Sequence, residues 1–151
     1  LAALRSSLWA LFLPVIVLLA LLFNATAWAD IAENDATSPL TNLYISLHTA
    51  DPGVGNSQLT NETAYTNYVR VAVARTTGGW DVPASGATAN AALIQFAQCG
   101  ASGATLTHVA IGTASSGAGT VLYAGPLASS LAVANGIQPQ FAAGALDVVE
   151  T

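Results

Sequence analysis

Charged residues are scarce in this chain of 151 residues, of which only 7% carry a charge. Lysine is absent, the three cationic side chains are all arginines, and eight acidic residues bring the formal net charge to −5. Soluble surfaces normally carry charge at roughly a quarter of their positions or more. We therefore infer that other protein covers much of this surface. Three scattered arginines also cannot form the basic patch that nucleic-acid binding requires, which argues against a nucleic-acid partner.

Residues that carry catalysis or bind metals are few as well. Cys99 is the single cysteine, which excludes an intramolecular disulfide. The histidines, Cys99 and the carboxylates do not cluster at metal-ligand spacing, so we predict no metal site, no catalytic residue and no cofactor. We interpret His48 as a strand-end residue bonded to the backbone, with Asp51 capping the next turn, and only secondarily as a catalytic imidazole. His108 is interpreted as a core or interface residue.

Apolar residues, by contrast, dominate the start of the chain. Residues 1–23 hold one charge, Arg5, and residues 8–23 hold none. This run fits a signal peptide that ends at the small residues around Trp28, because a basic start, an apolar stretch and a small-x-small site are all present. It is also long enough to span a bilayer, although Pro14 would kink such a helix. A third interpretation is a helix buried in a protein assembly.

Alternating strands separated by turns are predicted for the rest of the chain. Residues 43–48 alternate between apolar and polar side chains, which is typical of a half-buried strand. Val69, Val71 and Val73 repeat this pattern. Strands of this length between turns predict a mainly β fold, a single antiparallel, jelly-roll-like β-sandwich over residues 39–151, preceded by an apolar helical arm and joint over residues 1–38. Further strands are expected within 91–96, 106–111, 120–123, 127–134 and 145–149, with turns at 51–53, 78–79, 83–86, 100–103, 115–119 and 135–136.

Two local patterns make more specific predictions. Asn135-Gly136 predicts a hairpin between residues 127–134 and the stretch toward Phe141, because both central positions tolerate a positive φ. Trp80, which follows two glycines, is interpreted as a core residue at a strand start in preference to a sugar-binding platform.

Two of the three arginines lie close together in the predicted β-domain. We expect Arg70 and Arg75 to pair with carboxylates such as Glu62 or Asp81, in the same chain or in a neighbouring one.

A further signal is carried, in order, by residues 43–53, 68–75 leading to Gly79-Trp80, 90–96, 107–112, 117–125 and 141–146. Through these segments the chain, from about Leu18 onward, resembles a family of small bacteriophage virion proteins that are commonly described as tail-fibre or head-decoration proteins. The resemblance implies assembly without an active site, and it implies that the residues around 21–27 belong to a helix before the first strand. On this ground we favour a buried arm, and a membrane is not expected as a partner.

We accordingly predict a non-enzymatic virion protein, and first of all a capsid decoration protein on the major capsid lattice. The head is preferred to the tail because the chain is short for a fibre and lacks repeats. A tail-fibre component is one alternative, and an exported or membrane-anchored β-domain that uses residues 8–23 as signal or anchor is another. Expected partners are copies of the chain itself, as a trimer, and capsid or tail proteins. The candidate assembly residues are Trp9, Leu13, Leu18, Leu22, Phe23, Trp28, Arg70 and Arg75.

Overall fold

A computed structural model describes residues 40–83 and 85–149 of the chain. The predicted arm over residues 1–38, with Trp9, Leu13, Leu18, Leu22, Phe23 and Trp28, lies outside the described residues. Within them the fold is all β with antiparallel pairing and no helix, which confirms the predicted fold class. No helix that could cross a membrane is found there. The strands are β1 (Asn42–His48), β2 (Val71–Ala74), β3 (Ala87–Ala89), β4 (Ile94–Gln95), β5 (Ala104–Gly112), β6 (Val121–Val133), β7 (Gln140–Phe141) and β8 (Asp147–Val149).

The described residues divide into two compact units. The larger unit consists of residues 40–74 and 93–142, and the smaller one of residues 75–92 and 143–149 where these are described. The predicted domain limits, 1–38 and 39–151, stay a prediction.

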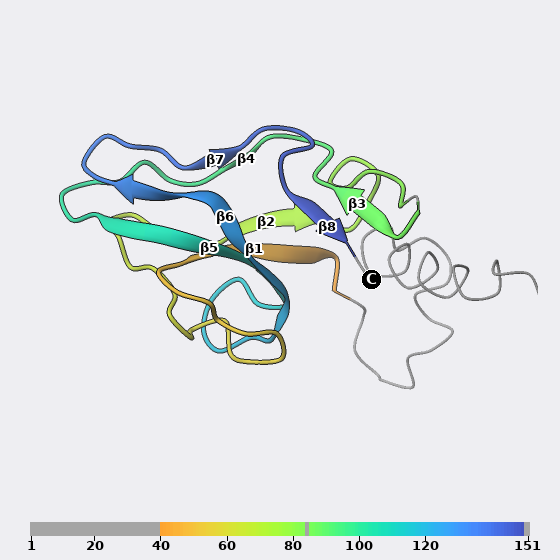
Figure 1. Cartoon of the computed structure of the whole chain (residues 1–151), viewed down its shortest axis with the longest axis horizontal. Helices are drawn as coiled ribbons and strands as arrows, with labels where there is room; N and C mark the ends of the chain where they lie inside the picture. Colours follow the sequence, from red (N-terminus) through yellow and green to blue (C-terminus); the bar gives the residue numbers. More distant parts are fainter. Residues whose placement is uncertain (1–39, 84, 150–151) are drawn as a thin grey trace, which may run out of the picture. The chain divides into compact units, whose positions relative to one another are not determined.

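A four-stranded antiparallel sheet in the order β2-β1-β5-β6 forms the centre of the larger unit (Figure 1). In β1, Leu43, Ile45 and Leu47 are fully buried on one face, as the alternation predicts. Ser46 and His48 point to the opposite face and are fully buried too. The second half of β1 is therefore covered on both faces, and its second face carries polar side chains.

Strand β6 corrects one prediction. The sequence suggested two strands over 120–123 and 127–134, whereas a single strand runs from Val121 to Val133 through Pro126. Because β6 lies at the edge of the sheet, it tolerates a residue that lacks an N–H donor. The pairing with β5 shifts from Leu106↔Leu131 to His108↔Pro126, so the intervening residues of β6 form a bulge.

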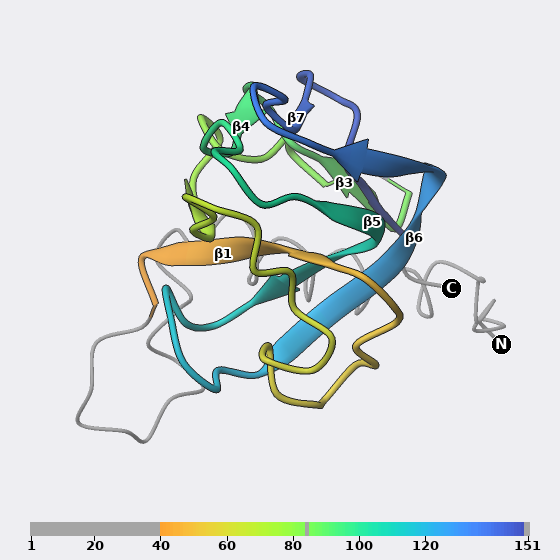
Figure 2. The same cartoon turned by 90° about the vertical axis from the view of Figure 1, so that its left-hand side faces the viewer.

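The hairpin predicted at Asn135-Gly136 is wrong in its pairing, although the turn itself forms. Gly136 has a φ of 86°, and the Ile137 N–H donates to the Ala134 carbonyl oxygen. The following strand β7 pairs with β4 and not with β6, and the two lie side by side in Figures 1 and 2. The reason is that residues 136–141 bond along residues 94–99, including Cys99 N–H to the Ile137 carbonyl.

The smaller unit is organised around Trp80 and Asn90. Trp80 is fully buried, which confirms its prediction as a core residue. It forms a β-bridge with Asn90, whose side-chain oxygen accepts from Leu146 N–H at 2.8 Å and thereby joins the two segments of the unit. Strands β3 and β8 pair beside this link. The sequence missed β3 because Ala-Thr-Ala is too short to show alternation.

Gly103 is packed so closely against the end of β6 that no side chain fits there. A Cβ at Gly103 would overlap the carbonyl oxygen of Val133, a backbone atom that cannot turn away. We expect Gly103→Ala to lower the free energy of unfolding by about 1–3 kcal/mol, the usual cost of overpacking. Urea unfolding followed by circular dichroism measures this effect. Gly125→Ala is the matched control, because a Cβ there meets nothing, and equal stability of the two variants would contradict the prediction.

Candidate functional site

The most elaborate polar arrangement in the described chain lies in the larger unit, where two loops meet the sheet. Residues 49–63 follow β1, and residues 113–120 connect β5 to β6 (Figure 2). The loops are bonded to each other, with Gln58 N–H donating to the Ala118 carbonyl at 2.7 Å and Ser57 Oγ donating to the same oxygen at 2.9 Å. They therefore form one hydrogen-bonded layer at the end of the sheet.

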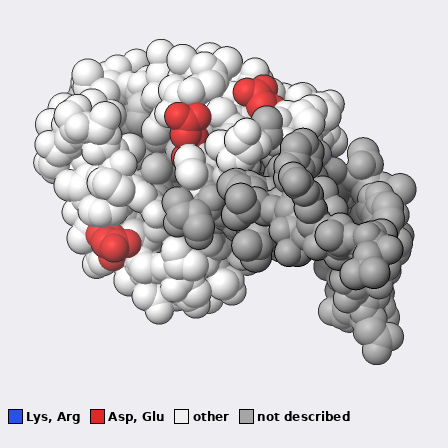
Figure 3. Space-filling model, turned by 45° about the vertical axis from the view of Figure 1, so that its right-hand side comes forward, with Lys and Arg blue, Asp and Glu red and all other residues white. Residues whose placement is uncertain are grey.

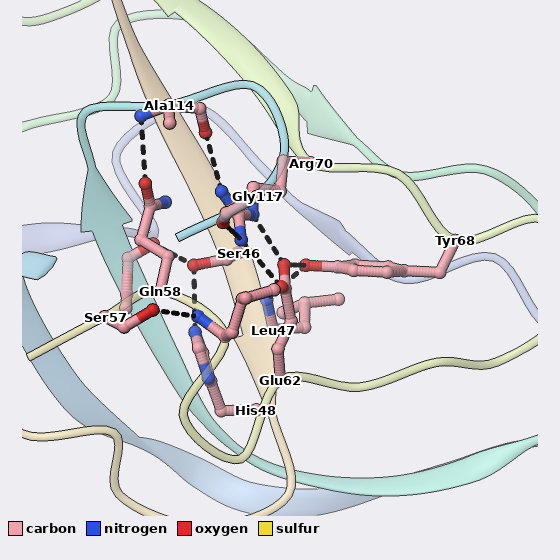
Figure 4. Close-up of polar contacts among 12 residues, drawn as sticks. Ser46, Leu47, His48, Ser57, Gln58, Glu62, Tyr68, Arg70, Ala114 and Gly117 are labelled. Atoms are coloured by element: carbon pink, nitrogen blue, oxygen red, sulfur yellow. Dashed lines mark hydrogen bonds and ion pairs between the residues drawn. The ribbon is translucent and has the colours of Figure 1, made fainter. Parts of the chain in front are cut away.

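Arg70 and Glu62 form a buried ion pair in this layer (Figure 4). Arg70 Nε donates to Glu62 Oε1 at 2.6 Å and Nη2 donates to Oε2 at 2.7 Å, so the pair is bidentate. The side chains are 3% and 11% exposed, respectively. Bonding to Glu62 raises the pKa of Arg70, so this guanidinium remains charged.

The same guanidinium also holds the second loop. Nη1 donates to the Ala114 carbonyl at 2.9 Å and Nη2 to the Gly117 carbonyl at 2.8 Å. On the other side, Tyr68 donates its hydroxyl proton to Glu62 and accepts from Leu47 N–H. Burial raises the pKa of Tyr68 well above its ordinary value, so its hydroxyl stays protonated and can donate. One ion pair thus connects both loops to β1.

His48 anchors the first loop from beneath. Its Nδ1 lies 2.9 Å from the Thr60 carbonyl oxygen, and its Nε2 lies 2.8 Å from Ser46 Oγ. A carbonyl can only accept, so Nδ1 carries the proton and Nε2 of the neutral ring accepts from the Ser46 hydroxyl. Burial lowers the pKa of His48 below 6.5, against the opposing effect of Thr60 and Glu62.

The predictions for His48 and Asp51 are confirmed. His48 is bonded to the backbone, and Asp51 Oδ1 accepts from Gly53 N–H at 2.9 Å and so caps the turn. His108 is half-buried in β5, directly opposite His48 in the register. The contact between Ser46 and His48 resembles a nucleophile with its base, but both side chains are fully buried and closed to a substrate.

Arg70 and Glu62 pair as predicted, within one chain. The interpretation of Val69 is wrong, since Val69 is 61% exposed while Arg70 is buried. The strand begins only at Val71, and Arg70 turns inward to reach Glu62. Arg75 is half-buried in the smaller unit. The roles of Arg70 and Arg75 at an interface stay predictions.

Sequence reasoning missed Ser46, Gln58 and Tyr68 as members of the cluster. Gln58 is fully buried, and its side-chain oxygen accepts from Ala114 N–H at 2.9 Å. For Ser46 a signal existed, because it shares a strand face with His48 at a spacing of two residues. In residues 40–83 and 85–149 no three of His, Cys, Asp or Glu come close enough together to hold a metal ion.

Because the polar groups of this arrangement are buried, comparison with known proteins is the more direct route to function. Residues 21–149 match the family described as podophage GP4 fiber I protein gp80. The chain belongs to this family. Comparison with curated proteins finds no match. The resemblance to phage virion proteins is thereby confirmed, and the chain is a structural component of a phage virion. A fibre family favours the tail-fibre alternative and gives no support to the predicted capsid decoration.

The buried ion pair makes a testable prediction about stability. Removing one partner leaves the other charge buried without compensation, which typically costs about 3–5 kcal/mol. We expect this cost for Arg70→Met, and a cost of similar sign for Glu62→Gln, in urea unfolding. The double variant should lose clearly less than the sum of the two. Val69→Met, at an exposed neighbour, should change stability by less than about 0.5 kcal/mol, and additive single effects would refute the coupling.

Proposed function

We propose that the chain is a non-enzymatic subunit of a tail-associated fibre in a podophage particle. The observation that carries the proposal is the match of residues 21–149 to a fibre family. In a fibre, each subunit contributes its surface to contacts with neighbouring subunits and with the tail. No cofactor is needed for that role, and the residues that the sequence singled out are then assembly residues.

The surface of the described residues supports contact with other protein. In the view of Figure 3, acidic groups are few and separated by uncharged residues, and no lysine or arginine is visible. Arg70, one of the three arginines of the chain, is buried in the larger unit and pairs there with Glu62. Such a surface is a poor match for nucleic acid, whose binding rests on cationic contacts to phosphates. It is better suited to packing against an equally uncharged protein surface.

Self-assembly and attachment to tail proteins follow from this proposal. Many weak contacts between identical subunits add up to a stable structure when the subunits are linked in one assembly. We expect a closed trimer, with the apolar residues 8–23 contributing buried area at about 25 cal/mol per Å² removed from water. The second arginine of the β-domain, Arg75, remains a candidate for contacts between subunits.

The location in the particle can be tested directly. We expect an antibody against the loop around the exposed residues 54–56 to label purified particles at the tail in negative-stain electron microscopy, and the chain to co-fractionate with tails after particles are disrupted. The portal and the major capsid protein are the fractionation controls. Label distributed over the head would restore the capsid-decoration alternative. Recovery from bacterial envelopes and not from particles would favour the exported alternative.

The role of the apolar segment can be tested in the full chain. Leu18→Asp combined with Leu22→Asp should convert the assembled protein to monomers in sedimentation velocity, because buried carboxylates oppose an apolar contact. Circular dichroism should still show the β-domain. The double substitution Ser6→Asp and Ser7→Asp adds the same charge outside the apolar residues 8–23 and should leave assembly intact. Loss of assembly in both variants, or in neither, would contradict the proposed arm contact.

A further inference from the structure

We propose that Ser46, His48, Glu62 and Arg70 form an acid-sensitive latch that holds the loop of residues 49–63 on the sheet and releases it when His48 takes up a proton. The released loop would expose the polar second face of β1, while the rest of the sheet stays folded. The proposal concerns a conformational property of the larger unit and does not depend on the location of the chain in the particle.

The loop is attached mainly by polar contacts. Its two large aliphatic side chains, Val54 and Leu59, are 66% and 57% exposed, so Pro52 is the main apolar side chain that the loop buries. The contacts that hold it are the His48 bond to the Thr60 carbonyl, the Glu62 pair with Arg70, the Ala114 N–H bond to Gln58, and backbone bonds to Leu47, Ala118 and Val121. A change of charge at this site therefore acts directly on the attachment.

His48 is held in a site built for the neutral ring. Its Nδ1–H donates to Thr60, and its Nε2 accepts from the Ser46 hydroxyl. After protonation Nε2 also becomes a donor, so the Ser46 hydroxyl has to turn and direct its own proton to the Ala110 carbonyl, at the long distance of 3.5 Å. Protonation thus places a second cation in the buried cluster and leaves the Ser46 proton with only a long hydrogen bond, while Nδ1–H still donates to Thr60.

The charged groups around His48 do not compensate for the cost of placing a positive charge on the buried ring. Arg70, from the segment before β2, and His108, from β5, both disfavour the imidazolium. Glu62, from the loop itself, favours it, but this carboxylate is already bonded to Arg70 and Tyr68. Desolvation is the largest effect, and lifting the loop would remove it by admitting water.

The sign of the pH dependence follows from linkage. Because burial lowers the pKa of His48 in the folded state, folding favours the neutral ring. The stabilisation is complete above the unfolded pKa of about 6.5, and it is lost as the pH falls from there through the folded pKa. The latch is therefore closed at neutral pH and is weakened progressively as the pH falls below about 6.5.

Hydrogen exchange of the full chain, read by mass spectrometry and corrected for the intrinsic pH dependence of exchange, tests the latch. Between pH 7.5 and pH 5 we expect a loss of protection confined to residues 49–63 and their contacts in 113–120, with β1 and β5 still protected. In His48→Gln the amide can replace both hydrogen bonds of the neutral ring without titrating, so this loss should disappear. His108→Gln is the matched control and should keep it.

Two outcomes would overturn the proposal. If His48→Gln retains the pH-dependent loss of protection, a group other than His48 opens the loop and the proposal is wrong. The protonation of His48 can also be followed in the unsubstituted protein, through the NMR shifts of its ring protons. This measurement serves if His48→Gln fails to fold. The ring should titrate over the same pH range as the loss of loop protection. Protonation of His48 with the loop amides still protected would refute the latch.

Discussion

The buried ion pair between Arg70 and Glu62 is the contact on which the two loops of the larger unit, residues 49–63 and 113–120, depend. The guanidinium donates to a carboxylate in one loop and to two carbonyl oxygens in the other, so both loops are fixed by a single side chain. Burying an ion pair is costly, and an apolar pair of similar size is often equally stable. The pair instead fixes the positions of its partners, because the rigid, planar guanidinium donates its hydrogen bonds in set directions.

These two hydrogen-bonded loops belong to a protein with few charged residues. The family match makes the chain a fibre protein of a phage virion. In the assembly that we propose, each subunit would meet other protein over much of its surface. Low charge removes the repulsion and desolvation cost that charged side chains would bring to such contacts. The one strong electrostatic interaction described in the larger unit is directed inward, to Glu62, where it shapes the loops that the subunit presents.

Much of the fold could be predicted because its signals are local. The alternation in β1, the turn at Asp51 and the core position of Trp80 each depend on residues within a few positions of one another. The errors arose where a local signal was overridden by a distant partner. Asn135-Gly136 turns the chain as predicted, yet the next strand pairs with β4, because the backbone of residues 96–99 takes its hydrogen bonds.

The sequence by itself determined a mainly β protein of low charge, with a resemblance to phage virion proteins that the family match confirms. Only the tertiary structure decided which groups surround His48 and Arg70. The carbonyls of Ala114 and Gly117 lie 44 and 47 positions along the chain from Arg70. Backbone carbonyls are the same at every residue, so no side-chain pattern could mark these two. Their role arises when the β5–β6 connection folds back over β1 and brings them within reach of the guanidinium.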